Sequence, residues 1–146
     1  MKVRSMAAAA AGAVVVLTGF AINAPAASAA PTVSDCKAKG YSFAKAITGA
    51  EMKGVIKRRC TVKSGGKTYY DQDYISFSTK DTKCDNYGPK GYVEPGGQSK
   101  NDKGCRGGWQ TSWVTSGYQT RKHFRYMLRT MNSKGTAKSS GWISLN

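Results

Sequence analysis

Apolar and polar residues alternate with a period of two over much of this chain. The alternation is clearest from Ile56 onward, where one side carries Ile56, Arg58, Cys60 and Val62 and the other carries Lys57, Arg59, Thr61 and Lys63. Successive side chains of a β-strand point to opposite faces, so this period predicts a strand. The sequence Ser-Gly-Gly-Lys at 64–67 predicts a hairpin turn, because glycine readily adopts the positive φ that such turns require. Further strands are predicted at 68–70, 74–79 and 109–115.

Residues 118–131 fit two different periods. The even positions form a mostly apolar stripe, as in a strand with one buried face: Tyr118, Thr120, Phe124, Tyr126, Leu128 and Thr130. A helix remains open, because Phe124, Met127, Leu128 and Met131 also follow helical spacing. We favour the strand, since the neighbouring segments are strand-like and aromatic residues suit a pleated surface. A turn at 132–135 and a last strand around 142–145 follow.

Two segments depart from the strand pattern. Phe43, Ala46, Ile47 and Ala50 follow the spacing of one helix face, which allows one short helix near residues 42–50. Tyr41, Phe43 and Ile47 would also suit a strand. Residues 85–108 hold seven glycines and two prolines, which predict a long loop rather than an element.

The first 29 residues have the three parts of a secretory signal peptide. Lys2 and Arg4 give a positive start, an uncharged apolar run covers 7–20, and Ala27 and Ala29 are the small residues that a signal peptidase requires. The apolar run is shorter than the roughly 20 residues that a membrane-spanning helix needs. We expect cleavage after about Ala29, secretion, and one small domain from 30 to 146 without a transmembrane segment.

The composition of that domain favours strands. It keeps two leucines, Leu128 and Leu145, against fourteen aromatic residues, and it is rich in glycine. Aromatic side chains suit pleated surfaces, and glycines suit the turns between short strands. We therefore predict an all-β fold, a small disulfide-stabilised β-sandwich or barrel.

Four cysteines, an even number, remain in the predicted domain. In an exported chain they are expected to form two disulfides, and three pairings are possible. We favour Cys36–Cys60 with Cys84–Cys105, because the second pair would close the glycine-rich loop. One histidine and no close cysteine pair argue against zinc, and we expect neither a metal nor another cofactor.

Positive charge dominates the predicted domain. Of its 29 charged side chains, 21 are basic and 8 acidic, and no acid follows Asp102. Such a field attracts polyanions, although net charge also keeps a secreted protein soluble. The expected partner is an anionic polymer or the cell-envelope surface: a cell-wall polymer, an acidic polysaccharide or nucleic acid.

The expected function is that of a secreted, non-enzymatic binding protein. Both periods of 118–131 place Arg121, Arg125 and Arg129 on one face, and guanidinium groups suit phosphate or carboxylate. The basic run Lys57, Arg58 and Arg59 and the aromatic pair Tyr69 and Tyr70 complete the candidate binding residues. Bases and sugars stack on such mixed surfaces, but the cores of small β domains have the same composition.

Two alternatives stay open. The segment between Cys84 and Cys105 could act as the loop of an inhibitor or toxin-like effector on another protein. A small secreted nuclease could use His123 with Arg125 and with Glu51 or Glu94. We assign no catalytic residue, since no motif of a known nuclease or hydrolase is present.

Overall fold

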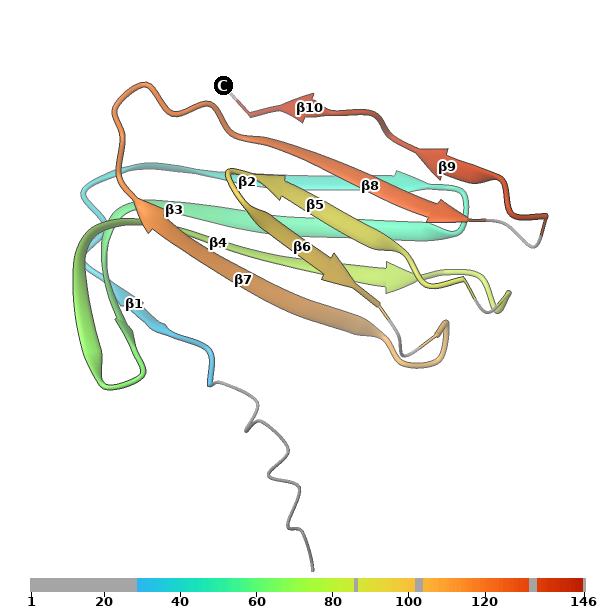
Figure 1. The fold of residues 1–146 in the computed structure, drawn as a ribbon, viewed down its shortest axis with the longest axis horizontal. Coiled ribbons are helices and arrows are strands. Elements are labelled where there is room, and N and C mark those ends of the chain that lie inside the picture. Colours follow the sequence, from blue (N-terminus) through green and yellow to red (C-terminus); the bar gives the residue numbers. More distant parts are fainter. Residues whose placement is uncertain (1–28, 86, 102–103, 132–133, 146) are drawn as a thin grey trace, which may run out of the picture.

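The computed structural model describes residues 29–145 except 86, 102–103 and 132–133. These residues form two antiparallel sheets of five strands each, packed face to face, and no helix (Figure 1). The first sheet contains β1 (Thr32–Ser34), β2 (Ala38–Ile47), β3 (Ala50–Ser64), β4 (Lys67–Asp81) and β7 (Trp109–Gly117). The second sheet contains β5 (Lys90–Glu94), β6 (Gly97–Lys100), β8 (Arg125–Met131), β9 (Ala137–Ser139) and β10 (Ile143–Ser144). The all-β prediction is confirmed.

Each sheet is organised around two long central pairings. In the first sheet, β3 pairs with β4, and β4 with β7, while β1 and β2 share the other edge of β3. In the second sheet, β5 pairs with β6 and β8, while β9 and β10 share the far edge of β8. Strand β6 also contacts β7, which brings the two sheets together along one side (Figure 1).

The core lies between the inner faces of the sheets. Its buried residues are Phe43, Ala50, Met52, Ile56, Ile75, Phe77, Val93, Phe124, Tyr126 and Leu128. The aromatic rings of Phe43 and Tyr126 join β2 to β8, with centroids 4.5 Å apart. Phe43 fills the space beside Gly54, where an added Cβ would lie 2.3 Å from its ring.

The predicted β3–β4 hairpin is confirmed. Ser64 pairs with Lys67, and Gly65 and Gly66 occupy the turn with φ of 56° and 75°. Near this end, Cys60, Val62 and Tyr74 form a smaller apolar cluster with Val33 of β1.

The short helix near residues 42–50 is wrong. This segment continues β2 to Ile47 and turns back at Gly49, which has a φ of 94°. Phe43 and Ile47 fit the apolar pattern of a helix as well as that of a strand. The segment is a strand because β2 pairs with β3 along its length. Ala50, counted on the helix face, begins β3 instead.

The long loop predicted at 85–108 is also wrong in part, because it contains the β5–β6 hairpin. Its glycines serve packing as well as turns. A Cβ on Gly91 would lie 2.8 Å from Thr79 Cγ2, so glycine lets β5 approach β4 closely. Gly97 is equally tight, with Val93 Cγ2 at 2.7 Å.

The strand favoured for 118–131 is right from Arg125 onward. Phe124, Tyr126, Leu128 and Thr130 are buried, as their shared phase predicts. The residues before Phe124 form a turn rather than the start of the strand. The last strand is shorter than expected, β10 at Ile143–Ser144, and β9 was not predicted. Half of the predicted turn, 132–133, lies outside the described residues.

Both favoured disulfides are present, Cys36–Cys60 and Cys84–Cys105. Disulfides persist in oxidising compartments, so they are compatible with an extracellular protein. The part of the chain that the structure describes contains no helix long and apolar enough to cross a membrane. The predicted signal peptide lies almost wholly outside the described residues.

Candidate functional site

The outer face of the second sheet presents alternate residues of β5 and β8. On β8 these are Arg125, Met127, Arg129 and Met131, and on β5 they are Lys90, Tyr92 and Glu94. Their neighbours in the chain, such as Leu128 and Val93, point into the core. We call these seven residues the outer face. Because alternate residues of a strand point to opposite faces, the same two strands supply this outer face and part of the core.

Cross-strand pairing arranges the outer face into rows. Lys90 lies opposite Arg129, Tyr92 opposite Met127, and Glu94 opposite Arg125. Glu94 and Arg125 form an ion pair, and the hydrogen bond that Arg125 Nε donates to the Glu94 carboxylate raises the pKa of Arg125. The guanidinium of Arg125 also lies 4.6 Å from the ring centroid of Trp142. The Arg125 row is thus neutralised within the protein.

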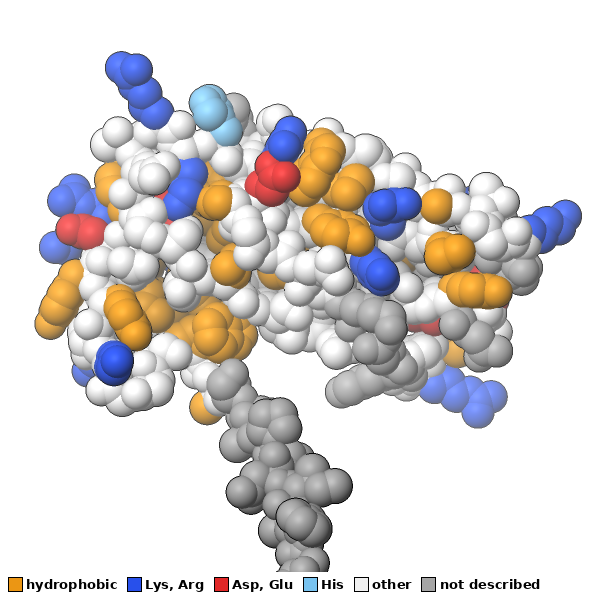
Figure 2. All heavy atoms as spheres, in the orientation of Figure 1, with side chains coloured by type: hydrophobic (Ala, Val, Ile, Leu, Met, Phe, Trp, Pro, Cys, Tyr) orange, Lys and Arg blue, Asp and Glu red, His pale blue; other side chains and the backbone are white. Residues whose placement is uncertain are grey.

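The Lys90–Arg129 row differs, because it joins two cations. Among the described residues, neither side chain has an acidic partner within ion-pair distance. Like charges at directly opposite positions destabilise a sheet, so this row costs stability unless an anion compensates it. In the view of Figure 2, basic and hydrophobic side chains lie side by side on the molecular surface.

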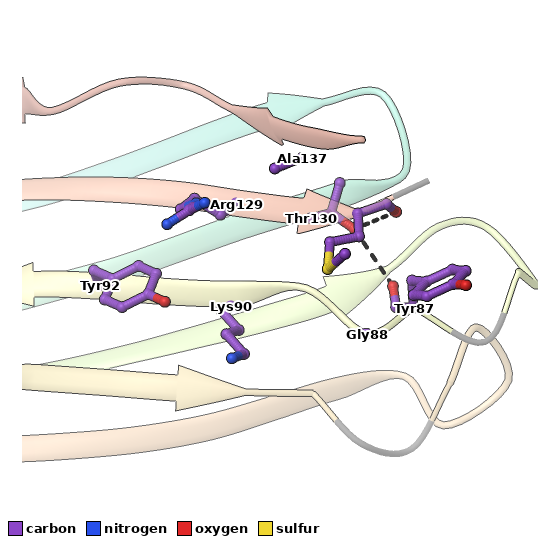
Figure 3. A pocket seen from close by; sticks show the side chains of 8 residues that line it. Tyr87, Gly88, Lys90, Tyr92, Arg129, Thr130 and Ala137 are labelled. Carbon is purple, nitrogen blue, oxygen red and sulfur yellow. Dashed lines mark hydrogen bonds between the residues drawn. The ribbon is translucent and has the colours of Figure 1, made fainter. Parts of the chain in front are cut away.

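A pocket of about 440 Å³ opens beside this row (Figure 3). Its lining combines the two cations with two tyrosines and small or apolar residues: Tyr87, Gly88, Lys90, Tyr92, Arg129, Thr130, Met131 and Ala137. Figure 3 shows Arg129, Lys90 and Tyr92 on adjacent strands at one side and Tyr87 at the other. The one hydrogen of the Thr130 hydroxyl is shared between the carbonyl oxygens of Tyr87 and Met131, at 3.4 and 3.3 Å, and the first of these contacts joins β8 to the segment before β5.

A second, shallower hollow of about 570 Å³ lies at the β5–β6 turn. It is lined by Tyr92, Val93, Glu94, Pro95, Gly96, Gly97, Gln98 and Trp142. Tyr92 lines both hollows.

The structure separates the three arginines predicted to share a face. Arg125 and Arg129 both project from the outer face of β8, four residues apart. Arg121 is exposed but lies in the turn before β8, so the strand face does not extend to it. Arg125 is occupied by Glu94 and Trp142, which leaves Arg129 as the arginine in the pocket.

The run Lys57, Arg58 and Arg59 does not form one basic patch. Lys57 is exposed, whereas Arg58 is 8% exposed and donates to the carbonyl oxygen of Gln119 at 2.8 Å. Arg59 bonds Asp71 at 2.9 Å. The phase predicted from the sequence already placed Arg58 on the same side as Ile56 and Cys60, and that side is buried.

Arg58 belongs to a buried cluster of three charges. Asp73 is fully buried, and its carboxylate lies 3.5 Å from both Arg58 Nε and Lys122 Nζ. Lys122 Nζ also donates to Ser116 Oγ at 2.8 Å and to the Gly117 carbonyl at 2.9 Å. The guanidinium of Arg58 lies 5.1 Å from the Phe124 ring centroid. This cluster joins β3, β4 and β7 to the turn before β8, which is a structural role.

Tyr69 and Tyr70 lie on the β3–β4 hairpin, away from the pocket. They are 46% and 71% exposed, and as neighbours on a strand they point to opposite faces. Trp109 and Trp113 of β7 are half-buried. Lys53 covers Trp109, with its Nζ 4.4 Å from the ring centroid.

His123 lies exposed in the turn before β8. Glu94, a candidate acid for a nuclease, is held by Arg125, and Glu51 lies on β3 in the other sheet. Among the described residues, no group of three or more histidine, cysteine, aspartate or glutamate side chains is arranged to hold a metal ion.

Lys90, Tyr92 and Tyr87 were missed by the sequence analysis. Lys90 and Tyr92 alternate with Gly91 and Val93, which is the same period-two signal used elsewhere. The glycines and prolines around these residues led to the prediction of a loop in place of a strand. Comparison with known proteins adds no family: no family model, no curated protein and no solved structure matches this chain.

Proposed function

We propose that this chain is a non-enzymatic binding protein for an anionic extracellular polymer, and that the outer face of β5 and β8 is its contact surface. The observation that carries the proposal is the Lys90–Arg129 row. Two opposed cations without an acidic partner among the described residues are unfavourable in the free protein. A bound phosphate or carboxylate relieves that repulsion, and the Arg129 guanidinium offers a donor fork suited to either group.

The two alternatives have less support. An inhibitory loop between Cys84 and Cys105 would need an exposed segment free to enter a partner's groove. Here that segment contains β5, which is paired on both sides, with β6 and with β8. A nuclease using His123 would need an acid and an arginine beside it, and Glu94 and Arg125 neutralise each other. Neither alternative explains why Lys90 lies opposite Arg129.

A charge-removal experiment tests the proposal. The variant carries Lys90→Gln and Arg129→Gln, and the control carries Lys57→Gln and Lys63→Gln, which remove the same charge from exposed positions of β3. Binding to heparin, a cell-wall teichoic acid and an oligonucleotide is measured as a function of salt. Each lost phosphate contact lowers the log–log salt slope by roughly one unit.

We expect the slope of the first variant to fall by about two and that of the control to stay close to the parent. Equal losses in both variants would mean that net charge alone drives binding. Absence of binding to every polyanion at low salt would refute the proposed function.

A further inference from the structure

We infer that the polymer taken by the outer face is single-stranded nucleic acid, with phosphates on the Lys90–Arg129 row and bases on the rings that flank it. This inference rests on the proposed function and names its ligand class. It depends on the aromatic residues of the two hollows, which a general polyanion-binding face does not need.

The outer face alternates charged rows with apolar rows. The Tyr92–Met127 row lies between the Lys90–Arg129 row and the Glu94–Arg125 row. Tyr87 and Met131 line the same pocket as Lys90 and Arg129. Rows on one face repeat every two residues, about 6.8 Å from the rise of a strand. A single strand of nucleic acid presents the same kind of alternation, because each flat base is joined to one phosphate.

The two tyrosine rings border the hollows, whereas the Arg125 guanidinium covers one face of the Trp142 ring. Tyr87 and Tyr92 both line the 440 Å³ pocket, and Tyr92 and Trp142 both line the second hollow. Neither tyrosine forms a ring contact with another aromatic residue of the described chain. The side chain of Met131, 45% exposed, adds polarisable surface next to Tyr87. Bases stack on such rings whatever their identity, so we expect little sequence preference.

The pocket chemistry favours nucleic acid over an acidic polysaccharide. Sugar rings also stack on tyrosine, but carboxylate or amide side chains around the ring commonly hold their hydroxyls, because these groups accept hydrogen bonds. The residues that line the first pocket include no such side chain; Glu94 and Gln98 line the second hollow, where Arg125 already holds the Glu94 carboxylate. Teichoic acids carry phosphates without flat aromatic rings, so they would leave the tyrosines unused.

The test compares anionic ligands of similar charge that differ in whether they carry aromatic bases. A dye-labelled oligothymidine of about 12 nucleotides is the main ligand, because single-stranded binding sites typically cover about 4–16 nucleotides. Inorganic polyphosphate is the comparison without rings, and heparin is the comparison with sugar rings. A duplex of the same length tests whether binding needs unpaired bases. Affinity is measured by fluorescence anisotropy and by competition.

The diagnostic variants are Tyr92→Leu and Tyr87→Leu, with Tyr70→Leu as the matched control on the distant hairpin. Loss of one stacked base weakens binding by about fivefold to a hundredfold. We expect this loss for oligothymidine with both diagnostic variants, no loss with Tyr70→Leu, and unchanged polyphosphate binding throughout. Tyr87 lies outside the strands, so its variant remains informative if Tyr92→Leu fails to fold.

Several outcomes separate this inference from the proposed function. Binding of polyphosphate but not oligothymidine by the unaltered protein would overturn the inference and leave the proposed function standing. Equal weakening of heparin and oligothymidine by Tyr92→Leu would assign the rings to sugar and also overturn it. Unchanged oligothymidine affinity in both folded tyrosine variants would do the same. Failure of every polyanion to bind would refute both proposals.

Discussion

Replacement of Asp73 by asparagine tests whether the buried charge cluster, which joins β3, β4 and β7 to the turn before β8, stabilises the fold. Asp73 is the one acid of the cluster and lies between Arg58 and Lys122, 3.5 Å from each. Asparagine has the same shape, and its carbonyl oxygen can still accept the backbone N–H of Arg59, which lies 3.2 Å from Asp73 Oδ1. The substitution removes the negative charge and puts an amide NH2 group in the place of Oδ2, which lies 3.5 Å from Lys122 Nζ.

The expected loss is large because two buried cations are left uncompensated. Breaking a buried ion pair by removing one partner typically costs about 3–5 kcal/mol. The total stability of a domain is of order 5–15 kcal/mol, so Asp73→Asn should bring this protein close to unfolding. Lys122→Met should cost less, since it leaves Arg58 and Asp73 as one neutral pair.

Denaturant unfolding of the parent and variants measures these differences. Asp71→Asn is the matched control, because Asp71 lies on the same strand and pairs with Arg59 at an exposed site. Its φ of 48° is tolerated by asparagine, and an exposed pair contributes about 0–1 kcal/mol. A loss under about 1 kcal/mol for Asp73→Asn, or a larger loss for Lys122→Met, would refute the reasoning.

Three further predictions concern the scaffold. Replacing Cys84 and Cys105 by serine should lower the unfolding free energy by about 3 kcal/mol in the chain-entropy model, measured by thermal melting, and an unchanged melting temperature would contradict it. Gly54→Ala should cost about 1–3 kcal/mol, because the new methyl group overlaps the Phe43 ring, and a neutral result would show that the ring moves freely. Burial raises the pKa of Tyr126, so stability is full below pH 10.0 and falls as pH rises above it. Tyr126→Phe should flatten that alkaline loss, and an ultraviolet titration of the variant should lose one tyrosine that ionises above pH 10.0.

Local patterning predicted the strands whose two faces differ in polarity. The alternation from Ile56 and the glycine pair at 65–66 correctly gave the β3–β4 hairpin, and the even positions from Phe124 to Thr130 correctly gave the buried face of β8. The even number of cysteines and the expected compartment predicted two disulfides, and the pairing favoured among the three possible ones is present.

The errors came from residues whose role depends on the other sheet. Gly91 and Gly97 resembled loop residues, but they are glycines because β5 and β6 pack tightly. Arg58 resembled a surface charge, although its phase was that of the core. The Lys90–Arg129 row could not be predicted, because it depends on the register of strands more than 30 residues apart.

The positions of the two disulfides determine how the molecule responds to a single cut by a protease. A cut at the β5–β6 turn lies between Cys84 and Cys105, so both fragments stay covalently linked. A cut at the β2–β3 turn lies between Cys36 and Cys60, with the same result. The tip at Gly65 and Gly66 lies between the two crosslinked segments. A cut there yields two chains, each with its own disulfide, that only strand pairing and core packing hold together.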